Sequence, residues 1–156
     1  MRKINYIVVH CSATREGCTL TSEALEAEHR RRGFRTTGYH YYIRRDGTVL
    51  GTRSLELPGA HCRGHNKYSI GICYEGGLDA RGNPKDTRTP EQRSALHLLV
   101  YQLLQQFRNA RVCGHRDLSP DLDGDGTVEP WEWVKQCPCF EVSKESVSYT
   151  HLTLPT

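Results

Sequence analysis

The sequence predicts a single α/β domain built on a central mixed β-sheet that is flanked by helices. The chain has 156 residues, long enough to bury about two-thirds of its unfolded surface around one core. Its segments follow the order strand, helix, hairpin, strand, helix, strand, which favours a sheet with helices packed on it. No internal repeat or linker divides the chain.

The first strand and the first helix are expected near the N-terminus. Residues 4–14, INYIVVHCSAT, are a short apolar run rich in β-branched residues, which predicts a buried strand that ends near His10. Residues 21–34, TSEALEAEHRRRGF, can be capped by Thr21 or Ser22 and close with arginines and Gly33. This pattern predicts an amphipathic helix.

A hairpin and a second buried strand follow. In residues 39–51, YHYYIRRDGTVLG, the pair Asp46-Gly47 separates two runs of aromatic and β-branched residues, the strongest short-range hairpin signal. Residues 68–77, YSIGICYEGG, predict another buried strand, which ends at paired glycines.

The second helix and the last strand complete the domain. In residues 89–107, TPEQRSALHLLVYQLLQQF, Thr89 caps the helix, Pro90 takes its first position and Gln92 completes a capping box. Apolar residues then recur on one face at helical spacing: Leu96, Leu99, Val100, Leu103 and Phe107. Residues 110–115, ARVCGH, predict a strand that ends near His115. We expect His10 and His115 to lie at the same edge of the sheet.

Composition excludes several classes of protein. The net charge of +3 is mild, and the densest basic group, residues 30–32, is expected to be a solvated helix face, so no nucleic-acid partner is predicted. No run approaches the roughly twenty apolar residues of a membrane helix. The seven cysteines are scattered and odd in number, and no apolar signal segment precedes them, so most are expected to be reduced. We expect a monomer made in the cytoplasm without a signal peptide.

The last ten residues, VSYTHLTLPT, differ in character from the rest of the chain. They carry no Asp, Glu, Lys or Arg and continue no earlier periodicity. They look like an in-frame translation of a transposon-end sequencing adaptor. We therefore expect the native domain to cover residues 1–146, with residues 147–156 not native.

Histidines and cysteines near the strand ends are candidate metal ligands. Zinc favours these two ligand types, and a catalytic zinc site uses three protein ligands with one position left for water. The candidates are His10, His115 and one of Cys137 and Cys139. Because these residues come from distant parts of the chain, their spacing alone does not prove that they bind a metal, and a satisfied core or surface residue is the alternative for each histidine.

Six stretches of the chain match motifs of one enzyme family and follow one another in the same order as those motifs: VVHCSAT, GYHYYIRRDGTV, HCRGHNKYSIGICYEGG, TPEQ, GHRD and KQCPCF. With them the chain resembles the zinc-dependent N-acetylmuramoyl-L-alanine amidases of the phage-lysozyme type, relatives of the peptidoglycan recognition proteins. The resemblance covers nearly everything from Ile4 to Val142, so residues 1–146 are expected to be an amidase domain. It implies the fold of that family and zinc-dependent hydrolysis of the amide bond between N-acetylmuramic acid and L-alanine in peptidoglycan.

The resemblance also implies roles for individual residues. The family's zinc ligands fall on His10, His115 and Cys137, its catalytic tyrosine and lysine fall on Tyr39 and Lys135, and a histidine that lines its substrate cleft falls on His61. Zinc lowers the pKa of bound water toward about 7. The Tyr39 hydroxyl and the Lys135 ammonium suit the negative charge that develops on the amide oxygen. For His61, a loop histidine with no role is the alternative.

Other interpretations of the same residues remain open. Cys113, His115, Cys137 and Cys139 together can form a closed structural zinc site with no position for water, but this leaves His10, Tyr39 and Lys135 unexplained. A non-catalytic peptidoglycan-binding module is the alternative function. Inhibition of a polymerase occurs in the family, yet no residue here indicates it. Without a signal segment, an enzyme of this kind reaches the cell wall after release or lysis, as a prophage or mobile-element endolysin does.

An acidic insertion lies between His115 and Cys137. Residues 121–132, DLDGDGTVEPWE, fit the calcium-loop pattern D-x-[DN]-x-[DN]-G-x₅-E. Its oxygens come from Asp121, Asp123, Asp125, Thr127 and Glu132, and calcium prefers six to eight oxygen ligands. A solvated acidic loop is the alternative, because the preceding segment with Pro120 is loop-like. The compact phage enzymes lack this insertion, which can brace the loop that carries Lys135 and Cys137.

Overall fold

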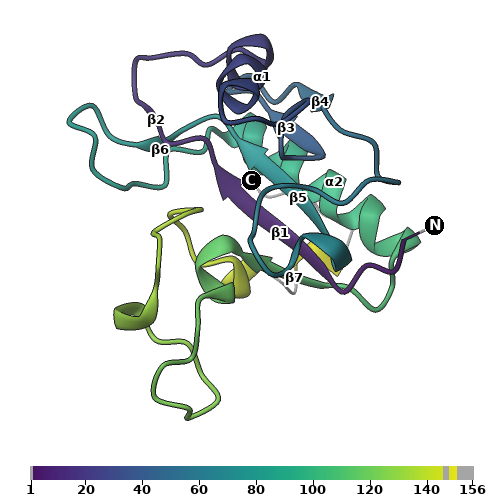
Figure 1. The fold of residues 1–156 in the computed structure, drawn as a ribbon. Helices are drawn as coiled ribbons and strands as arrows, with labels where there is room; N and C mark the ends of the chain where they lie inside the picture. The colour runs from purple at the N-terminus through teal and green to yellow at the C-terminus, as the bar shows by residue number, and fades with distance from the viewer. Residues whose placement is uncertain (1, 146–147, 151–156) are drawn as a thin grey trace.

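The computed structural model describes residues 2–145 and 148–150, which form one α/β domain (Figure 1). The main sheet has the strand order β4-β3-β5-β1-β7, and its strands are β1 Tyr6–Cys11, β3 Tyr41–Ile43, β4 Val49–Gly51, β5 Ser69–Tyr74 and β7 Arg111–Gly114. Strand β1 pairs in parallel with β5 and β7, and β3 pairs in parallel with β5. Strands β3 and β4 form the antiparallel hairpin around Asp46-Gly47. The predicted mixed sheet is confirmed.

The two helices begin where the capping signals place them. Helix α1, Ser22–Arg31, is capped by Thr21, and helix α2, Pro90–Gln106, starts with the complete capping box of Thr89 and Gln92. Four of the five apolar positions expected on one face of α2 are buried, and Phe107 packs partly buried beside them. Helical periodicity therefore predicted the buried side of α2.

The sheet offers a different surface on each face because side chains alternate along a strand. On β1, Ile7 and Val9 belong to the same core cluster as Leu96 of α2. The residues between and beyond them, Val8 and His10, therefore point to the opposite face. There α1 covers only part of the sheet, through Leu25, which packs with Tyr42 and Cys73. His10 emerges on this second face.

Several short elements lie outside the sequence-based expectations. Strands β2, Thr14–Arg15, and β6, Gly77–Leu78, form a separate parallel pair. Five short 3₁₀ helices are present among the described residues: η1 Asn66–Tyr68, η2 His115–Leu118, η3 Pro130–Glu132, η4 Val142–Glu145 and η5 Ser148–Thr150. Elements of two to four residues carry no periodicity, so sequence patterns do not reveal them.

The C-terminal region packs on α2. In η5, Tyr149 is 1% exposed, and its ring centroid lies 5.9 Å from that of His97. Residues 147 and 151–156 of the segment expected not to be native lie outside the described residues, so that expectation stays a prediction. All seven cysteines are free thiols. Neither helix in the described part of the chain is long and apolar enough to span a bilayer.

Candidate active site

Two histidines meet at the carboxyl edge of the parallel strands. His10 lies near the end of β1, and His115 directly follows β7 as the first residue of η2. Since β1 and β7 are adjacent and parallel, their ends reach the same edge, and the two ring centroids are 4.6 Å apart. The structure brings these histidines together, as their positions at the ends of two predicted strands led us to expect.

The loop that carries Cys137 to this edge is held in place by hydrogen bonds to its backbone. The Arg116 N–H donates a hydrogen bond to the Cys137 carbonyl at 2.9 Å, and the Tyr74 hydroxyl donates to the carbonyl of Pro138 at 2.6 Å. Gly114 makes room for this loop, because a Cβ there would lie 2.6 Å from Pro138 Cδ. The end of β7 and the Cys137 loop thus fit closely only with glycine at 114.

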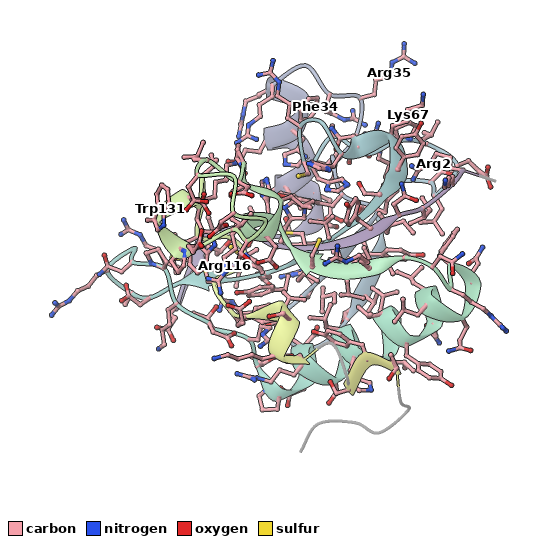
Figure 2. All side chains as sticks on the ribbon, turned by 90° about the horizontal axis from the view of Figure 1, so that it is seen from below. Arg2, Phe34, Arg35, Lys67, Arg116 and Trp131 are labelled. Carbon is pink, nitrogen blue, oxygen red and sulfur yellow. The ribbon has the colours of Figure 1, made fainter. Side chains whose placement is uncertain are left out.

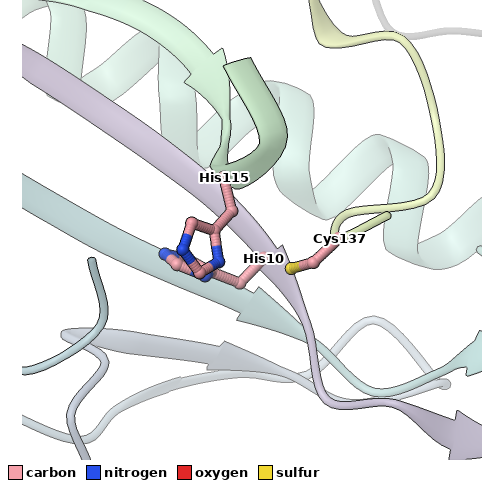
Figure 3. Close-up of side chains that lie close together, drawn as sticks. All are labelled: His10, His115 and Cys137. Carbon is pink, nitrogen blue, oxygen red and sulfur yellow. The ribbon is translucent and has the colours of Figure 1, made fainter. Parts of the chain in front are cut away.

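These three side chains form one potential metal-binding group. His10, His115 and Cys137 each offer a ligand atom, and the three atoms lie within 4.8 Å of one another. Figure 3 shows them converging from β1, the start of η2 and the loop beyond the insertion. Within residues 2–145 and 148–150, neither Cys113 nor Cys139 joins such a group. Of the two cysteines left open by the sequence, Cys137 is the one that faces the histidines.

The surroundings of His10 keep its imidazole neutral. The residue is 1% exposed, and burial, with His61, His115 and Lys135 nearby, lowers the pKa of His10 well below its ordinary value. Its Nε2 lies 2.8 Å from Nδ1 of His61. A neutral imidazole is the form that binds a metal, so the local electrostatics suit His10 as a ligand.

Tyr39 borders the same group. Its ring centroid lies 5.1 Å from that of His10. The preceding residue must be glycine, because a Cβ on Gly38 would overlap the Ala60 backbone. The Gly38 N–H also donates a hydrogen bond to Nδ1 of His29 at 2.7 Å. Burial raises the pKa of Tyr39 well above its ordinary value. Its hydroxyl is therefore protonated at neutral pH and can donate a hydrogen bond.

A cleft of about 860 Å³ opens beside the group. The residues lining it come from the end of α1, the loop before β5, η2 and the far end of the insertion: Arg32, Phe34, Ala60, His61, Cys62, Arg63, His65, Asn66, His115, Asp117, Leu118, Ser119, Pro120, Val134 and Lys135. Lys135 is exposed. Arg32 was expected to be a merely solvated helix residue, yet it borders this cleft.

The acidic insertion folds back on itself. Glu132, 2% exposed, accepts hydrogen bonds from the N–H groups of Leu122 and Glu129, both at 2.7 Å. Asp121 accepts from Gly124 at 2.9 Å and from Gly126 at 2.7 Å. Both glycines have positive φ, 73° and 87°, which suits glycine. Figure 2 shows Trp131 of η3 near the outer edge of this lobe, and it is 64% exposed.

The carboxylates of the insertion form two overlapping groups. Asp121, Asp123 and Glu132 form one, and Asp123, Asp125 and Glu129 form the other, with ligand atoms within 4.8 Å in each. Sequence reasoning did not include Glu129, although it holds the ninth position of the loop, which often contributes to calcium sites. The neighbouring carboxylates of Glu132 and Asp125 raise the pKa of Glu129 to about 8. Crowded carboxylates therefore share protons in this loop.

Comparison with known proteins agrees with this fold and indicates the family. The family described as N-acetylmuramoyl-L-alanine amidase matches residues 1–139. An endolysin of Klebsiella phage KP32 is 35% identical over 143 residues, covering 92% of this chain and 85% of that protein. The solved amidase LysC from Clostridium intestinale superimposes with a TM-score of 0.68 at 27% identity, over 88% of this chain and 77% of that one. A peptidoglycan-recognition protein of Drosophila melanogaster is 29% identical over 74% of this chain and 65% of its own length.

The fold and the cleft at the carboxyl edge of the sheet define a protein of the amidase and peptidoglycan-recognition class. Within that class, the chain belongs to the N-acetylmuramoyl-L-alanine amidase family, as the family match and the endolysin relative show. Peptidoglycan is the substrate or ligand of this family.

Proposed function

We propose that this protein is a zinc-dependent amidase that hydrolyses the bond between the lactyl group of N-acetylmuramic acid and L-alanine. The observation that carries the proposal is the group of His10, His115 and Cys137, whose ligand atoms lie within 4.8 Å of one another beside a large cleft. Because peptidoglycan is a polymer with peptide branches, an open cleft beside the reacting atoms suits it as a substrate.

The three side chains fit zinc. Two imidazoles and one thiolate are ligands that zinc prefers, and three protein ligands are the number found in catalytic zinc sites. Zinc bound there supplies a Lewis acid and a water molecule whose pKa is lowered toward about 7. The buried, neutral His10 has a lone pair for this purpose.

Tyr39 and Lys135 then act on the amide itself. The protonated Tyr39 hydroxyl lies beside His10 and can donate a hydrogen bond to the amide oxygen as negative charge develops there. Lys135 lines the cleft and brings a positive charge to the same region. Either group can pass a proton to the departing alanine amine, so that the products are a lactyl carboxylate and a free L-alanine amino terminus.

Product analysis tests the reaction. Purified protein is incubated with peptidoglycan, with and without a zinc chelator, and new L-alanine amino termini are measured. We expect them only when zinc is present. Release of reducing sugar would instead mean a glycosidase. If no bond is cleaved in the zinc-loaded protein while peptidoglycan is still retained in a pull-down, the protein is the alternative, a non-catalytic binding module.

Two variants separate a catalytic zinc site from a structural one. His10→Ala should lose zinc, measured by mass spectrometry under native conditions, whereas a closed site of Cys113, His115, Cys137 and Cys139 would retain it. Tyr39→Phe should keep zinc and lose roughly 10²- to 10⁴-fold in rate, the usual contribution of a positioned proton donor. An active Tyr39→Phe variant would remove Tyr39 from the mechanism.

The proposal extends to where the enzyme acts. Relatives named endolysins support action on the cell wall after release or lysis, and we include a prophage or mobile-element origin and a monomeric state. Adding the protein to intact and to permeabilised bacteria, and measuring lysis, tests whether it acts on the cell wall only after release. Lysis of permeabilised cells alone is the expected outcome. Light scattering of the purified protein measures its mass in solution.

We also include calcium as a ligand of the insertion, residues 121–132. Five carboxylates gather there within the two overlapping groups, and a divalent cation relieves their repulsion, with the Thr127 carbonyl as a further oxygen ligand. At a concentration of 100 Kd, calcium would stabilise the fold by about 2.7 kcal/mol, which for a chain of this size raises Tm by roughly 5–10 °C.

Thermal unfolding tests this part of the proposal. Removing calcium with a chelator that spares zinc should lower Tm, and the double variant Asp121→Asn, Asp123→Asn should no longer respond to calcium. An unchanged Tm in the zinc-loaded protein would reject the calcium site and favour a solvated acidic loop. Calcium should also bind more tightly as pH rises toward 8, since Glu129 must lose its proton.

A further inference from the structure

His61 is inserted between the site and the sheet. It is 8% exposed, so it offers little surface to a substrate although it borders the cleft. Its Nδ1 lies 2.8 Å from Nε2 of His10, and its Nε2 lies 3.1 Å from Oγ of Ser69. Ser69 is fully buried at the start of β5. Both ring nitrogens of His61 are therefore engaged inside the protein.

The backbone is shaped to hold this ring. A Cβ on Gly71 of β5 would lie 2.6 Å from Cγ of His61, and a Cβ on Gly59 would overlap its Cδ2. The loop is tied down as well, because Oδ1 of Asn66 accepts hydrogen bonds from the N–H groups of His61 and Cys62, both at 2.9 Å. Two glycines and one asparagine thus fix the position of the imidazole.

Two arrangements of hydrogens satisfy this chain of contacts. In the first, His10 Nε2–H donates to His61 Nδ1, and His61 Nε2–H donates to Ser69 Oγ. In the second, Ser69 and His61 donate in the opposite direction, and the single proton of neutral His10 lies on Nδ1. Only the first arrangement leaves a free lone pair on Nδ1 of His10. Since Nε2 already takes part in the hydrogen bond, Nδ1 is the atom left for a metal.

We propose that His61 is a positioning residue that holds His10 in the tautomer with the proton on Nε2 and thereby presents Nδ1 to zinc. The inference rests on the zinc site proposed above. Metal-bound histidines almost always donate their second ring N–H to a fixed acceptor, and loss of that acceptor typically costs about 10- to 100-fold in metal affinity or activity. In this protein the acceptor is a second histidine, which Ser69 orients in turn.

A matched pair of variants tests the role of the acceptor. Asparagine and leucine have nearly the same shape, but only asparagine places an oxygen close to the position of His61 Nδ1. His61→Leu should weaken zinc binding by about 10- to 100-fold in a chelator competition, and His61→Asn should retain most of the affinity. His65→Gln is the control, because His65 borders the same cleft and contacts Tyr6 rather than His10.

A second measurement needs no metal and no variant at His61. Long-range ¹H–¹⁵N NMR spectra of the metal-free wild-type protein report which ring nitrogen of His10 carries the proton, with the signal assigned from the His10→Ala variant. We expect the proton on Nε2. This readout remains available if the His61 variants fail to fold.

The outcomes separate this inference from the proposed function. A proton on Nδ1 of His10, or His61→Leu with wild-type zinc affinity, would overturn the role of His61. Equal weakening in the Leu and Asn variants would also overturn it, because the acceptor would then not be the cause. If wild-type protein binds no zinc, the proposed function fails, while the NMR result still decides the His10 tautomer. A role in substrate contact alone would raise KM and leave zinc affinity unchanged.

Discussion

Glu75 is a buried carboxylate that joins the end of β5 to the hairpin. It is 1% exposed and pairs with Arg44 at 2.8 Å, and it also accepts from the N–H groups of Leu20 at 2.7 Å and Arg45 at 3.0 Å. Burial on its own would raise the pKa of Glu75, but these hydrogen bonds outweigh it and lower the pKa from its ordinary value of 4.5. The ionised form therefore stabilises the fold.

Glu75→Gln should destabilise the protein by about 2 kcal/mol at pH 7, because charge-assisted hydrogen bonds are lost. Since the folded pKa is lowered, this contribution is present above about pH 4.5 and is lost as pH falls through the folded value. Urea unfolding at pH 7 and at acidic pH should thus show the gap between wild type and variant closing in acid. The control Glu16→Gln removes an exposed pair with Lys85 and should change stability by less than about 1 kcal/mol. A gap that is constant with pH would contradict the assignment.

The residues of the site were predictable to different degrees. Ligand chemistry and the strand ends predicted His10, His115 and one of two cysteines as candidate zinc ligands. The choice of Cys137 and the roles of Tyr39 and Lys135 came from the resemblance alone. The hydrogen bond between His10 and His61 joins residues 51 positions apart, and no local pattern encodes such a contact. Glu129 was missed for a different reason, because the motif leaves its position unspecified.

Among the elements, α2 has an N-terminus tied to its neighbours. Thr89 Oγ1 accepts from the N–H of Gln92 at 3.1 Å and donates to the carbonyl of Arg45 at 2.6 Å. Gln92, fully buried, donates to the carbonyl of Glu75 at 2.9 Å. The cap therefore stabilises the helix and also fastens it to the hairpin and to β5.

Thr89→Ala should cost about 1–2 kcal/mol, toward the upper part of the range for capping residues, because it removes both hydrogen bonds. The matched change Thr21→Ala removes an exposed cap whose side chain accepts from the Ala24 N–H, and it should cost roughly 0.5–1 kcal/mol. Chemical denaturation of the two variants gives the comparison. Equal losses would mean that the link from Thr89 to Arg45 contributes nothing.

Elements with strong local signals were predicted closely. The caps of both helices, the Asp46-Gly47 turn and the buried strands are each specified by residues near one another in sequence, and the structure places all of them where those residues lie. By contrast, β2 and β6 exist because distant segments pair. Each of these strands has only two residues, too few to show a sequence period, so only the three-dimensional structure reveals them.

At the scale of the whole molecule, the topology of the sheet brings the candidate functional residues to one edge. Strands β1, β5 and β7 run parallel, so their carboxyl ends and the loops that follow them lie together. The insertion enters from this edge after η2 and returns Lys135 and Cys137 to it. Figure 1 shows the segment between β7 and the C-terminal part as a lobe beside the sheet. The position of this lobe makes it one wall of the cleft.

The cleft is predominantly positive. Arg32, Arg63 and Lys135 line it, and Asp117 is the only acidic residue among its lining residues. Asp117 Oδ2 already accepts a hydrogen bond from the Gly114 N–H at 2.8 Å. Peptide branches of peptidoglycan carry carboxylates, so this charge favours their approach.

Arg63→Ser should therefore weaken substrate binding without altering the group of His10, His115 and Cys137. We expect KM for a soluble muropeptide to rise about two- to fivefold at low salt, the effect of losing one exposed charge, with kcat nearly unchanged. Because the Debye length shortens from about 30 Å at 0.01 M to about 8 Å at 0.15 M salt, the difference from wild type should shrink as salt is added. Arg35→Ser is the matched control, since Arg35 is exposed but does not line the cleft, and Figure 2 shows it projecting from the molecule beyond Phe34. An equal rise in KM for both variants would mean that net charge, rather than the cleft, attracts the substrate.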